Sequence, residues 1–411
     1  MKVLFIVNFF PPEYVGGAEV AAFNSCYGLL QRGVECSVLS VNARSPQHTD
    51  QEYVFKGVKV RQVGYYHTGS QVLTVFDPLI YRRIVQELRA VKPDLVHVHN
   101  VSGTSLAPFV ACQRLGLPVV LTLHDHWLLC PNNMLFRGNG ILCDPAMARP
   151  SCSKCYRRYD FWGNIPFRRQ IYAWLTRDVR RFISPSQCLV ELHVAAGYSR
   201  ERFGVLRYGL GPGFSDGEPP TLIPKWLSED GEANVMLFAG QVVEVKGTQV
   251  LAKALPLLER YVERLRLWVA GAGDETCMNE LRRFVPTSVR LVGKLQFYEL
   301  KALYAAAGLT IVPSIWYDNS PMVIYESFLA GTPVLGANIG GIPELIQEGD
   351  TGYLFIPGDA VDLAEKAILH FARPASERQA MRQACIRWAK ENFNLERHVD
   401  GLLEIYHEVL G

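Results

Sequence analysis

Short apolar runs bounded by turn residues alternate with longer amphipathic stretches along both halves of the chain. In the first half, runs such as KVLFIVNF and ECSVLSV are separated by stretches with helical spacing, for example residues 18–31 and 78–91. In the second half the alternation starts again at NVMLFAG and continues to GYLFIP. Buried strands that alternate with helices of this length predict parallel sheets covered by helices on both faces. The pattern therefore predicts an α/β chain with two Rossmann-like domains.

Residues 209–231 interrupt this pattern, because the segment is rich in glycine and proline and has no sustained periodicity. We expect an interdomain linker there, between an N-terminal domain of residues 1–208 and a C-terminal domain of residues 232–390. The length of 411 residues agrees with two domains, since a single core rarely grows to that size. The last residues, 391–411, include an amphipathic helical pattern.

The composition is that of a soluble globular protein, with 49% hydrophobic and 20% charged residues. The formal net charge of +2 gives no general reason to expect a nucleic-acid partner. No apolar run has the length of a membrane span, and the first one ends at Pro11 without the cleavage site of a signal peptide. We therefore expect a cytoplasmic chain whose ten cysteines are reduced or metal-bound rather than disulfide-bonded.

The segment 309–354 holds the densest group of candidate binding features. A buried strand, LTIVPS, is followed by a loop with Asp318 and then by a helix that begins near Pro321 and carries Glu326. Loops after parallel strands hold ligands in α/β proteins, and the free N–H groups at a helix start bind anions. Two carboxylates that flank such a helix start can bind the hydroxyls of a sugar and a ribose. The alternative is an ordinary strand–helix unit with incidental acids.

Two loops of the first domain also have the residue types of a ligand site. Residues 11–19, PPEYVGGAE, follow the first strand and open the first helix, where Gly16 and Gly17 allow the backbone to approach a phosphate closely. His124 and Asp125 end the strand PVVLTLHD at the carboxyl edge of the predicted sheet. The imidazole of His124 can bond a sugar hydroxyl, or it can pair with Asp125 in a purely structural role.

The strand LVHVHN places His97 and His99 on one face, because side chains alternate along a strand. This spacing is compatible with metal ligation, but we expect a structural role for His97. We expect His99 and Asn100, at the end of the strand, to border a ligand.

Four cysteines lie within an insertion of residues 126–165. Cys130, Cys143, Cys152 and Cys155 have the spacing C-x12-C-x8-C-x2-C. Four thiolates with one CxxC pair are compatible with a tetrahedral structural zinc. The alternative is a set of reduced thiols in a polar loop. In either case the insertion is expected to shape the acceptor end of the site rather than to catalyse.

Residues 156–181 contain seven arginines and two aspartates, interleaved with aromatic residues. Basic and aromatic residues on a helix can bind an anionic membrane surface. The alternative is a solvated helix with its aromatic residues in the core. Nucleic acid is not expected, because no nucleic-acid-binding motif accompanies the segment. This pattern would place the protein peripherally at the inner face of the membrane.

These features occur together in one known family. The segment 309–354 and six further motifs, PPEYVGGAE, LVHVHN, LTLHD, FAGQVVEVKG, VAGAGDE and LVGKL, resemble those of the retaining glycosyltransferases of family 4. The resemblance implies the GT-B fold, in which two Rossmann-like β/α/β domains face each other across a cleft. It also implies that the last helix crosses back to the N-terminal domain. The motifs extend over nearly the whole chain, so they are specific for the family but not for one substrate.

The chain departs from the family pattern at two positions. The family has two glutamates separated by seven residues, whereas this chain has Asp318, one methylene shorter, and then Glu326. The family also has an arginine and a lysine that clamp the donor diphosphate, and here these positions hold Gln241 and Lys246. Glutamine supplies no charge to the leaving group. Either Lys246 supplies more of the charge that stabilises the diphosphate, or another arginine such as Arg207 substitutes, or catalysis is slow.

The resemblance assigns roles to individual residues. It places His124, Lys246 and Asp318 in catalysis. The acceptor side is expected to hold Glu19, His99, Asn100 and Asp125. The residues expected to bind the donor are Gly16, Gly17, Gln241, Lys246, Gly271, Gly293, Lys294, Leu295, Asp318, Ser320, Pro321, Met322, Val323 and Glu326.

By this resemblance we expect a retaining transferase that moves a sugar from a nucleotide sugar, such as UDP-glucose, to a saccharide or lipid-linked acceptor in polysaccharide or glycoconjugate synthesis. The family is described by front-face attack, in which the leaving diphosphate takes the acceptor's proton, so no metal and no separate base are required. One alternative is a GT-B nucleotide-sugar 2-epimerase, which should lack the Asp318–Glu326 arrangement. Another is a non-catalytic saccharide-binding relative, which the changes at Gln241 and Asp318 make plausible.

Overall fold

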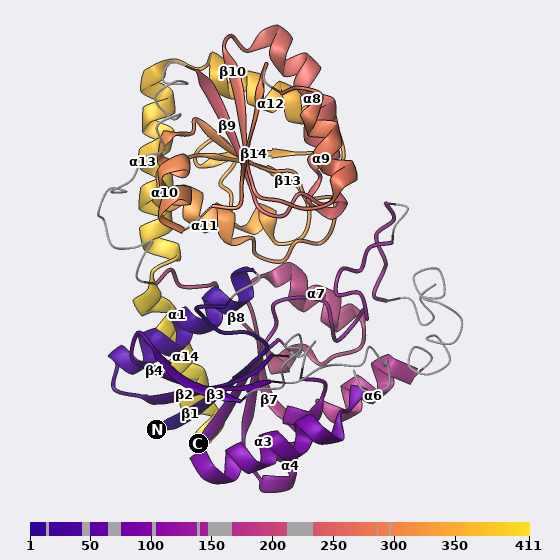
Figure 1. Ribbon diagram of the computed structural model, residues 1–411, viewed down its shortest axis with the longest axis vertical. Coiled ribbons are helices and arrows are strands. Elements are labelled where there is room, and N and C mark those ends of the chain that lie inside the picture. Colours follow the sequence, from indigo (N-terminus) through magenta and orange to yellow (C-terminus); the bar gives the residue numbers. More distant parts are fainter. Residues whose placement is uncertain are drawn as a thin grey trace. The chain divides into compact units, whose positions relative to one another are not determined.

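The chain divides into two compact units in the computed structural model (Figure 1). The first unit consists of Met1–Gly211 together with Leu395–Gly411, and the second of Pro212–Asn394. No helix among the described residues is long and apolar enough to cross a bilayer. The structure describes residues 1–13, 16–42, 50–64, 75–100, 104–137, 140–146, 167–211, 233–285, 287–295 and 297–411, so most of the predicted linker lies outside it.

The described part of the first unit contains an eight-stranded sheet in the order β3-β4-β2-β1-β5-β6-β7-β8. All neighbouring strands are parallel except β3, which pairs with β4 in the antiparallel sense. The strands are β1 (Lys2–Val7), β2 (Glu35–Asn42), β3 (Gln51–Phe55), β4 (Val58–Gly64), β5 (Leu95–His99), β6 (Val119–Thr122), β7 (Val179–Ser184) and β8 (Phe203–Val205). The central strands β1, β5 and β6 are almost wholly buried, as their unbroken apolar runs predict.

Two helices of the first unit begin at residues whose side chains cap them. Asp77 accepts hydrogen bonds from two backbone N–H groups at the start of α3, and Ser186 accepts one at the start of α7. The helices are α1 (Gly17–Gln31), α3 (Pro78–Val91), α4 (Ala107–Leu115), α6 (Arg168–Leu175) and α7 (Gln187–Ala195), with a 3-10 turn, η3 (Arg200–Arg202).

The C-terminal helix α14 (Leu395–Leu410) completes the core of the first unit. Its buried residues Val399, Leu402 and Tyr406 pack in the same cluster as the residues of β1 and α1. Gly28 of α1 permits the close approach, because a Cβ atom at this position would clash with the side chain of Val399. The yellow helix therefore lies beside α1 in Figure 1, although nearly the whole chain separates the two in sequence.

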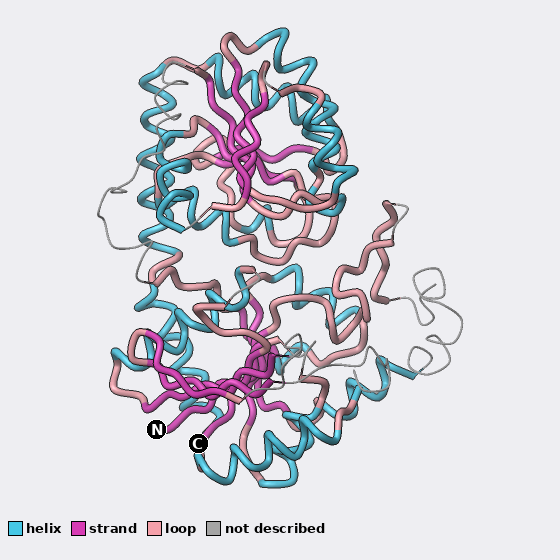
Figure 2. The backbone as a smooth tube through the Cα atoms, in the orientation of Figure 1, coloured by secondary structure: helices cyan, strands magenta, loops and turns pink. Residues whose placement is uncertain are grey.

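The second unit contains a fully parallel six-stranded sheet in the order β11-β10-β9-β12-β13-β14 among the residues that are described. Figure 2 shows strands in the middle of this unit and helices on its flanks. The strands are β9 (Asn234–Ala239), β10 (Leu265–Ala270), β11 (Val289–Gly293), β12 (Leu309–Val312), β13 (Val334–Ala337) and β14 (Gly352–Phe355). The helices are α8 (Thr248–Tyr261), α9 (Glu275–Arg282), α10 (Phe297–Ala306), α11 (Met322–Leu329), α12 (Ala360–Ala372) and α13 (Ala375–Asn392), with 3-10 turns η5 (Glu244–Lys246) and η6 (Ile342–Glu344).

Each sheet has one point where the strand order reverses. In the first unit the loops after β1 and β5 leave the sheet side by side in opposite directions, and in the second unit the loops after β9 and β12 do so. Open α/β sheets bind ligands in the crevice outside the carboxyl ends of such strands. The topology therefore directs attention to these two pairs of loops.

The packing of α14 generates a prediction about stability. Leu402 is 1% exposed in the core of the first unit, whereas Leu410 of the same helix is 41% exposed. Leu402→Ala should lower the free energy of unfolding by about 2–5 kcal/mol, because it leaves a cavity in the core. Leu410→Ala should change it by less than about 0.5 kcal/mol. Urea denaturation followed by circular dichroism tests this difference, and equal effects of the two substitutions would contradict it.

Candidate functional site

The loops after β9 and β12 are in direct contact in the second unit. The backbone N–H of Ile315 donates to the carbonyl of Val245 at 2.9 Å. Gly247 has a φ of 74°, and a Cβ atom there would clash with the carbonyl of Pro313. This position therefore needs glycine for both its conformation and its space. The contact brings Lys246, the residue before it, over the loop that holds Asp318.

Lys246 and Asp318 form an ion pair at the point where the strand order reverses. Lys246 Nζ lies 2.6 Å from Asp318 Oδ2, and their side chains are 29% and 8% exposed. Ser314 Oγ donates to the same carboxylate oxygen at 2.8 Å. The lysine also lies over the ring of Trp316, 5.5 Å from its centroid. A nearly buried carboxylate is thus compensated, and a partly exposed ammonium group is held where it can meet an anion.

A third loop, after β13, closes around the backbone of Asp318. The N–H of Gly341 donates to the carbonyl of Asp318 at 2.8 Å. Gly340, with a φ of 65°, contacts the same residue so closely that no side chain fits there. The helix α11 then begins at Met322 with Pro321 as its N-cap, and no side chain of the described residues caps it. The first N–H groups of this helix can therefore bind an anion.

Glu326 lies one turn inside α11 and is held by a residue of the neighbouring helix α10. The hydroxyl group of Tyr304, which is fully buried, donates to Glu326 Oε2 at 2.8 Å. Burial raises the pKa of Glu326 to about 7, and the bond from Tyr304 partly offsets this shift. Glu326 as a whole residue is half-buried, and a carboxylate can accept more than one hydrogen bond. Nearby, the hydroxyl groups of Ser320 and Tyr325 lie 2.6 Å apart.

The other donor residues predicted in this unit lie on the remaining loops of the same sheet edge. Gln241 is exposed directly after β9. Gly271 follows β10 and packs against the carbonyl of Gly240, where a Cβ atom would clash. Gly293, at the end of β11, has a φ of 80° and leads to Lys294 and Leu295. The structure therefore brings these residues to one edge of the sheet, with Lys246 and Asp318 at its centre.

In the first unit, the loops after β1 and β5 line a small cavity. Its lining includes Asn8, Ala18, Glu19, His99 and Asn100. Glu19 is 8% exposed, and its Oε2 accepts a hydrogen bond from the backbone N–H of Gly16 at 2.9 Å. Glu19 therefore caps the first helix, which Gly17 begins, in addition to lining the cavity. Asn100 adopts a left-handed backbone conformation with a φ of 56°.

Three histidines behind this cavity form a ladder of hydrogen bonds. Nδ1 of His99 lies 2.9 Å from Nε2 of His124, and Nδ1 of His124 lies 2.8 Å from the hydroxyl group of Tyr208. His97 is fully buried between Tyr406 and Thr122, at 2.5 and 2.7 Å, which confirms its structural role. Both ring nitrogens of His124 are thus engaged.

The ladder is neutral, and two of its members must share one tautomer. Burial is the largest cause that lowers the pKa of His124, to about 3, and that lowers the pKa values of His97 and His99 well below the usual range. A neutral imidazole carries one N–H. If His99 Nδ1 donates to His124 Nε2, then His124 Nδ1 must donate to Tyr208. If instead Tyr208 donates to His124 Nδ1, then His124 Nε2 must donate to His99 Nδ1. His99 and His124 therefore carry their protons on the same ring position.

Asp125 is not the partner of His124. Its Oδ1 accepts a hydrogen bond from the backbone N–H of Trp127 at 2.8 Å. Burial raises the pKa of Asp125 to about 6, partly offset by this bond and by the charge of Arg168. The residues that hold His124 are His99 and Tyr208 instead, so the structural pairing considered from the sequence is wrong.

The proposed zinc ligands are only partly visible. Cys130 and Cys143 are free thiols of intermediate exposure, while Cys152, Cys155 and residues 147–166 lie outside the described part of the chain. Within the described ranges no group of three or more His, Cys, Asp or Glu residues could hold a metal ion. The four-cysteine site therefore stays a prediction.

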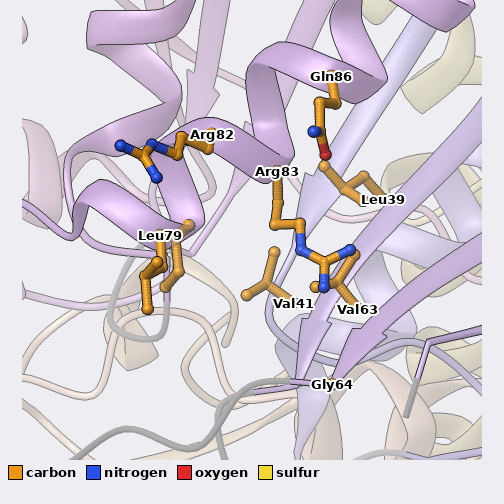
Figure 3. A pocket seen from close by; sticks show the side chains of 9 residues that line it. Leu39, Val41, Val63, Gly64, Leu79, Arg82, Arg83 and Gln86 are labelled. Carbon is orange, nitrogen blue, oxygen red and sulfur yellow. The ribbon is translucent and has the colours of Figure 1, made fainter. Parts of the chain in front are cut away.

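A larger cavity of the first unit lies away from this chemistry. It has a volume of about 460 Å³ and lies between α3 and the ends of β2 and β4. Figure 3 shows the guanidinium group of Arg83 over Val41 and Val63, with Gln86 near Leu39. None of the residues predicted to bind donor or acceptor lines it. Arg83 forms an ion pair with Asp50 at 2.8 Å. The candidate binding residues therefore lie at the strand-order reversals rather than in this cavity.

The sequence analysis did not identify Ser314, Tyr304 and Tyr208 as parts of the site. Ser314 ends the strand motif LTIVPS, a position from which it could have been suspected. Tyr304 and Tyr208 lie 22 and 84 residues from the side chains that they hold. No local signal in the sequence marks such partners.

Comparison with known proteins shows matches along nearly the whole chain. The family model "Glycosyltransferase Family 4" matches residues 15–210, and "Glycosyl transferases group 1" matches residues 233–372. The sulfoquinovosyl transferase SQD2 of Arabidopsis thaliana is 24% identical over 90% of this chain and 67% of that protein. The glycogen synthase of Mycobacterium tuberculosis is 25% identical, over 93% and 89%. The crystal structure of Anabaena HepE with UDP and glucose has a TM-score of 0.72 at 19% identity, over 99% and 100% of the two chains.

The neutral histidine ladder generates a prediction about acid stability. The folded-state pKa of His124 is about 3, below its ordinary value of 6.5, so the unfolded chain binds more protons between these values. Stability must therefore fall as the pH drops below about 6.5, by up to ~1.4 kcal/mol per pH unit for one such group. His124→Gln should reduce this fall between pH 6.5 and 5, and His407→Gln on the exposed face of α14 should not. Thermal unfolding across this range tests it, and parallel curves for all three proteins would refute it.

Proposed function

Because this chain belongs to the family 4, group 1 glycosyltransferases, and has their GT-B fold, we propose that it transfers a hexose from a UDP-sugar, such as UDP-glucose, with retention. The acceptor is a saccharide or a lipid-linked saccharide in polysaccharide or glycoconjugate synthesis. The observation that carries the proposal is the Lys246–Asp318 pair beside the start of α11, at the strand-order reversal of the second unit. Solved relatives of this fold bind UDP and UDP-glucose.

In this proposal the donor diphosphate lies against the ammonium group of Lys246 and the first N–H groups of α11. Both supply positive potential where negative charge develops on the leaving group. Lys246 has three N–H donors, so it can bind phosphate oxygens and keep its bond to Asp318. Gln241 adds a neutral donor at the edge of the same loop. We therefore assign to Lys246 the stabilisation of the leaving diphosphate.

The two acids divide the rest of the donor between them. Glu326 accepts hydrogen bonds from the ribose hydroxyls, since it lies one turn inside the helix whose start binds phosphate. Asp318, in the loop before that helix, accepts a hydrogen bond from a hydroxyl of the transferred sugar. Its carboxylate is fixed by Ser314 and Lys246, which leaves its position well defined for a hydroxyl of given geometry.

Transfer with retention then needs no protein nucleophile. The acceptor hydroxyl attacks the anomeric carbon on the face from which the diphosphate leaves. The bond from carbon to the acceptor oxygen forms as the bond to the phosphate oxygen breaks, and the hydroxyl proton passes to that phosphate oxygen. The protein contributes positioning and electrostatic stabilisation. In this proposal Glu19, His99, Asn100 and Asp125 line the acceptor side, and His124 lies near the transferred sugar.

A non-catalytic sugar-binding role is the second candidate, because Gln241 lacks the charge that the family has at this position. Incubation with UDP-sugars and a saccharide acceptor separates the two candidates. Transfer predicts release of UDP and a product one sugar longer. Tight UDP binding without either product would instead support the binding role and refute the proposed transfer.

Substitution of Lys246 tests the proposed stabilisation of the leaving group. Lys246→Ala should lower turnover by on the order of 10²-fold, the usual scale for loss of a charge-stabilising donor. The matched control is Lys253→Ala, which removes an exposed lysine of α8 in the same unit and should leave turnover unchanged. A loss of less than about threefold with Lys246→Ala would exclude this role.

The two acids should separate in binding measurements. Glu326→Ala should weaken UDP and UDP-sugar alike, because the ribose is common to both. Asp318→Ala should leave UDP binding nearly intact while it lowers transfer and blurs the choice between donor sugars, since a site built for a hydroxyl rejects donors that lack it. Calorimetric titration with UDP tests this division. Equal loss of UDP affinity in the two variants would contradict it.

A further inference from the structure

Helix α6 buries an arginine and exposes apolar side chains, which is the reverse of an ordinary surface helix. Arg168 is 2% exposed, and its guanidinium group donates to the carbonyls of Trp127 and Leu128 at 2.5 and 3.3 Å. The same group lies 3.8 Å from the ring centroid of Tyr172, which is fully buried. The helix is therefore fixed to the first unit through an arginine and a tyrosine rather than through its other large apolar side chains.

Those other apolar side chains form an exposed stripe. Phe167, Ile171 and Trp174 are 69%, 37% and 59% exposed. They lie four and three residues apart, so they share one side of the helix. Because the stripe contributes little to the core, folding of the first unit does not account for it. An apolar surface that is not needed for folding marks an interaction site.

The exposed charged residues that follow the stripe are Arg177, Asp178 and Arg180. Arg168 is buried, and Arg169 donates to the backbone carbonyls of Leu129 and Pro145 at 3.3 and 2.7 Å. The exposed cations beside the stripe are therefore Arg177 and Arg180. The guanidinium group of Arg177 lies 4.7 Å from the ring centroid of Trp174, and it is also 3.6 Å from Asp178. Arg180 is exposed at the start of the following strand. The surface thus combines protruding aromatic rings with cationic groups, although the whole chain is nearly neutral at +2.

We propose that the stripe Phe167–Ile171–Trp174, with Arg177 and Arg180 beside it, is a docking surface for an anionic lipid bilayer. Aromatic side chains insert at the boundary between head groups and acyl chains, and neighbouring guanidinium groups bind anionic head groups. The surface rests on the first unit alone, so it does not depend on the proposed transfer reaction.

The size of the stripe favours a bilayer over a second copy of the chain. Each aromatic side chain offers roughly 150–250 Å². Three partly exposed side chains therefore supply a few hundred Å² at most, well below the ~800 Å² per partner of a stable protein interface. Insertion into a bilayer has no such requirement, because the lipid surrounds each ring. Among the described residues, the side chains of Phe167, Ile171 and Trp174 are exposed.

Vesicle co-sedimentation of the full-length protein tests the proposal. Wild-type protein should sediment with vesicles that contain phosphatidylglycerol and far less with vesicles of phosphatidylcholine alone. The double variant Phe167→Ala/Trp174→Ala should lose most of this binding. Arg177→Gln/Arg180→Gln should weaken it by on the order of tenfold, because each basic residue near the surface adds to the attraction. The matched control is Val361→Ala/Leu369→Ala, which removes two exposed apolar side chains from α12 of the second unit and should bind like the wild type.

Three results would overturn the proposal: wild-type protein that ignores anionic vesicles, a stripe variant that binds as well as the wild type, or a control variant that loses binding equally. Gel filtration distinguishes the rival occupant. A wild-type dimer that the stripe substitutions convert to a monomer, without vesicle binding, would assign the surface to a second copy of the chain. Unchanged thermal unfolding of the variants ensures that lost binding reports the surface, and UDP release measured with a soluble acceptor reports the transfer reaction separately.

Discussion

The contact between the loops after β9 and β12 is the constraint on which the proposed donor site depends. It exists because Gly247 lets two backbones meet where a side chain would clash with Pro313. This contact places the ammonium group of Lys246 against the carboxylate of Asp318, so that a nearly buried acid is compensated without a bound ligand. The start of α11 and Glu326 then follow in the chain at fixed positions. Loss of the glycine would displace all of these groups together.

The two units solve the burial of polar groups in different ways. The second unit pairs opposite charges, Lys246 with Asp318, and holds Glu326 by a hydrogen bond from a buried tyrosine. The first unit buries neutral imidazoles that bond to one another and to Tyr208 and Tyr406. A neutral ladder avoids the cost of buried charge, and its members constrain each other's tautomers. The proposed acceptor side is thereby built on imidazoles that hydrogen-bond to one another, whereas the proposed donor side holds the cation Lys246.

In the C-terminal helix α14 and in α6, the hydrophobicity of a side chain does not predict whether it is buried. Tyr406 and His398 of α14 complete the interior of a unit formed mainly by the first half of the chain. In α6 an arginine is buried over aromatic rings while a phenylalanine and a tryptophan face outward. Cation–π and carbonyl contacts satisfy the guanidinium group, and the exposed rings become available for an external partner. Neither arrangement follows from hydrophobicity alone.

The sequence by itself determined most of the strands, the parallel sheets and the family, because these depend on the local period of apolar residues and on short motifs. It missed β3, whose residues are exposed or half-buried at the edge of a sheet. The spacing of Asp318 and Glu326 indicated a sugar and a ribose site. Only the tertiary structure decided which groups hold these acids and His124, since Lys246, Tyr304 and Tyr208 reach them from 72, 22 and 84 residues away. Such contacts are set by the packing of whole elements, for which a local pattern contains no information.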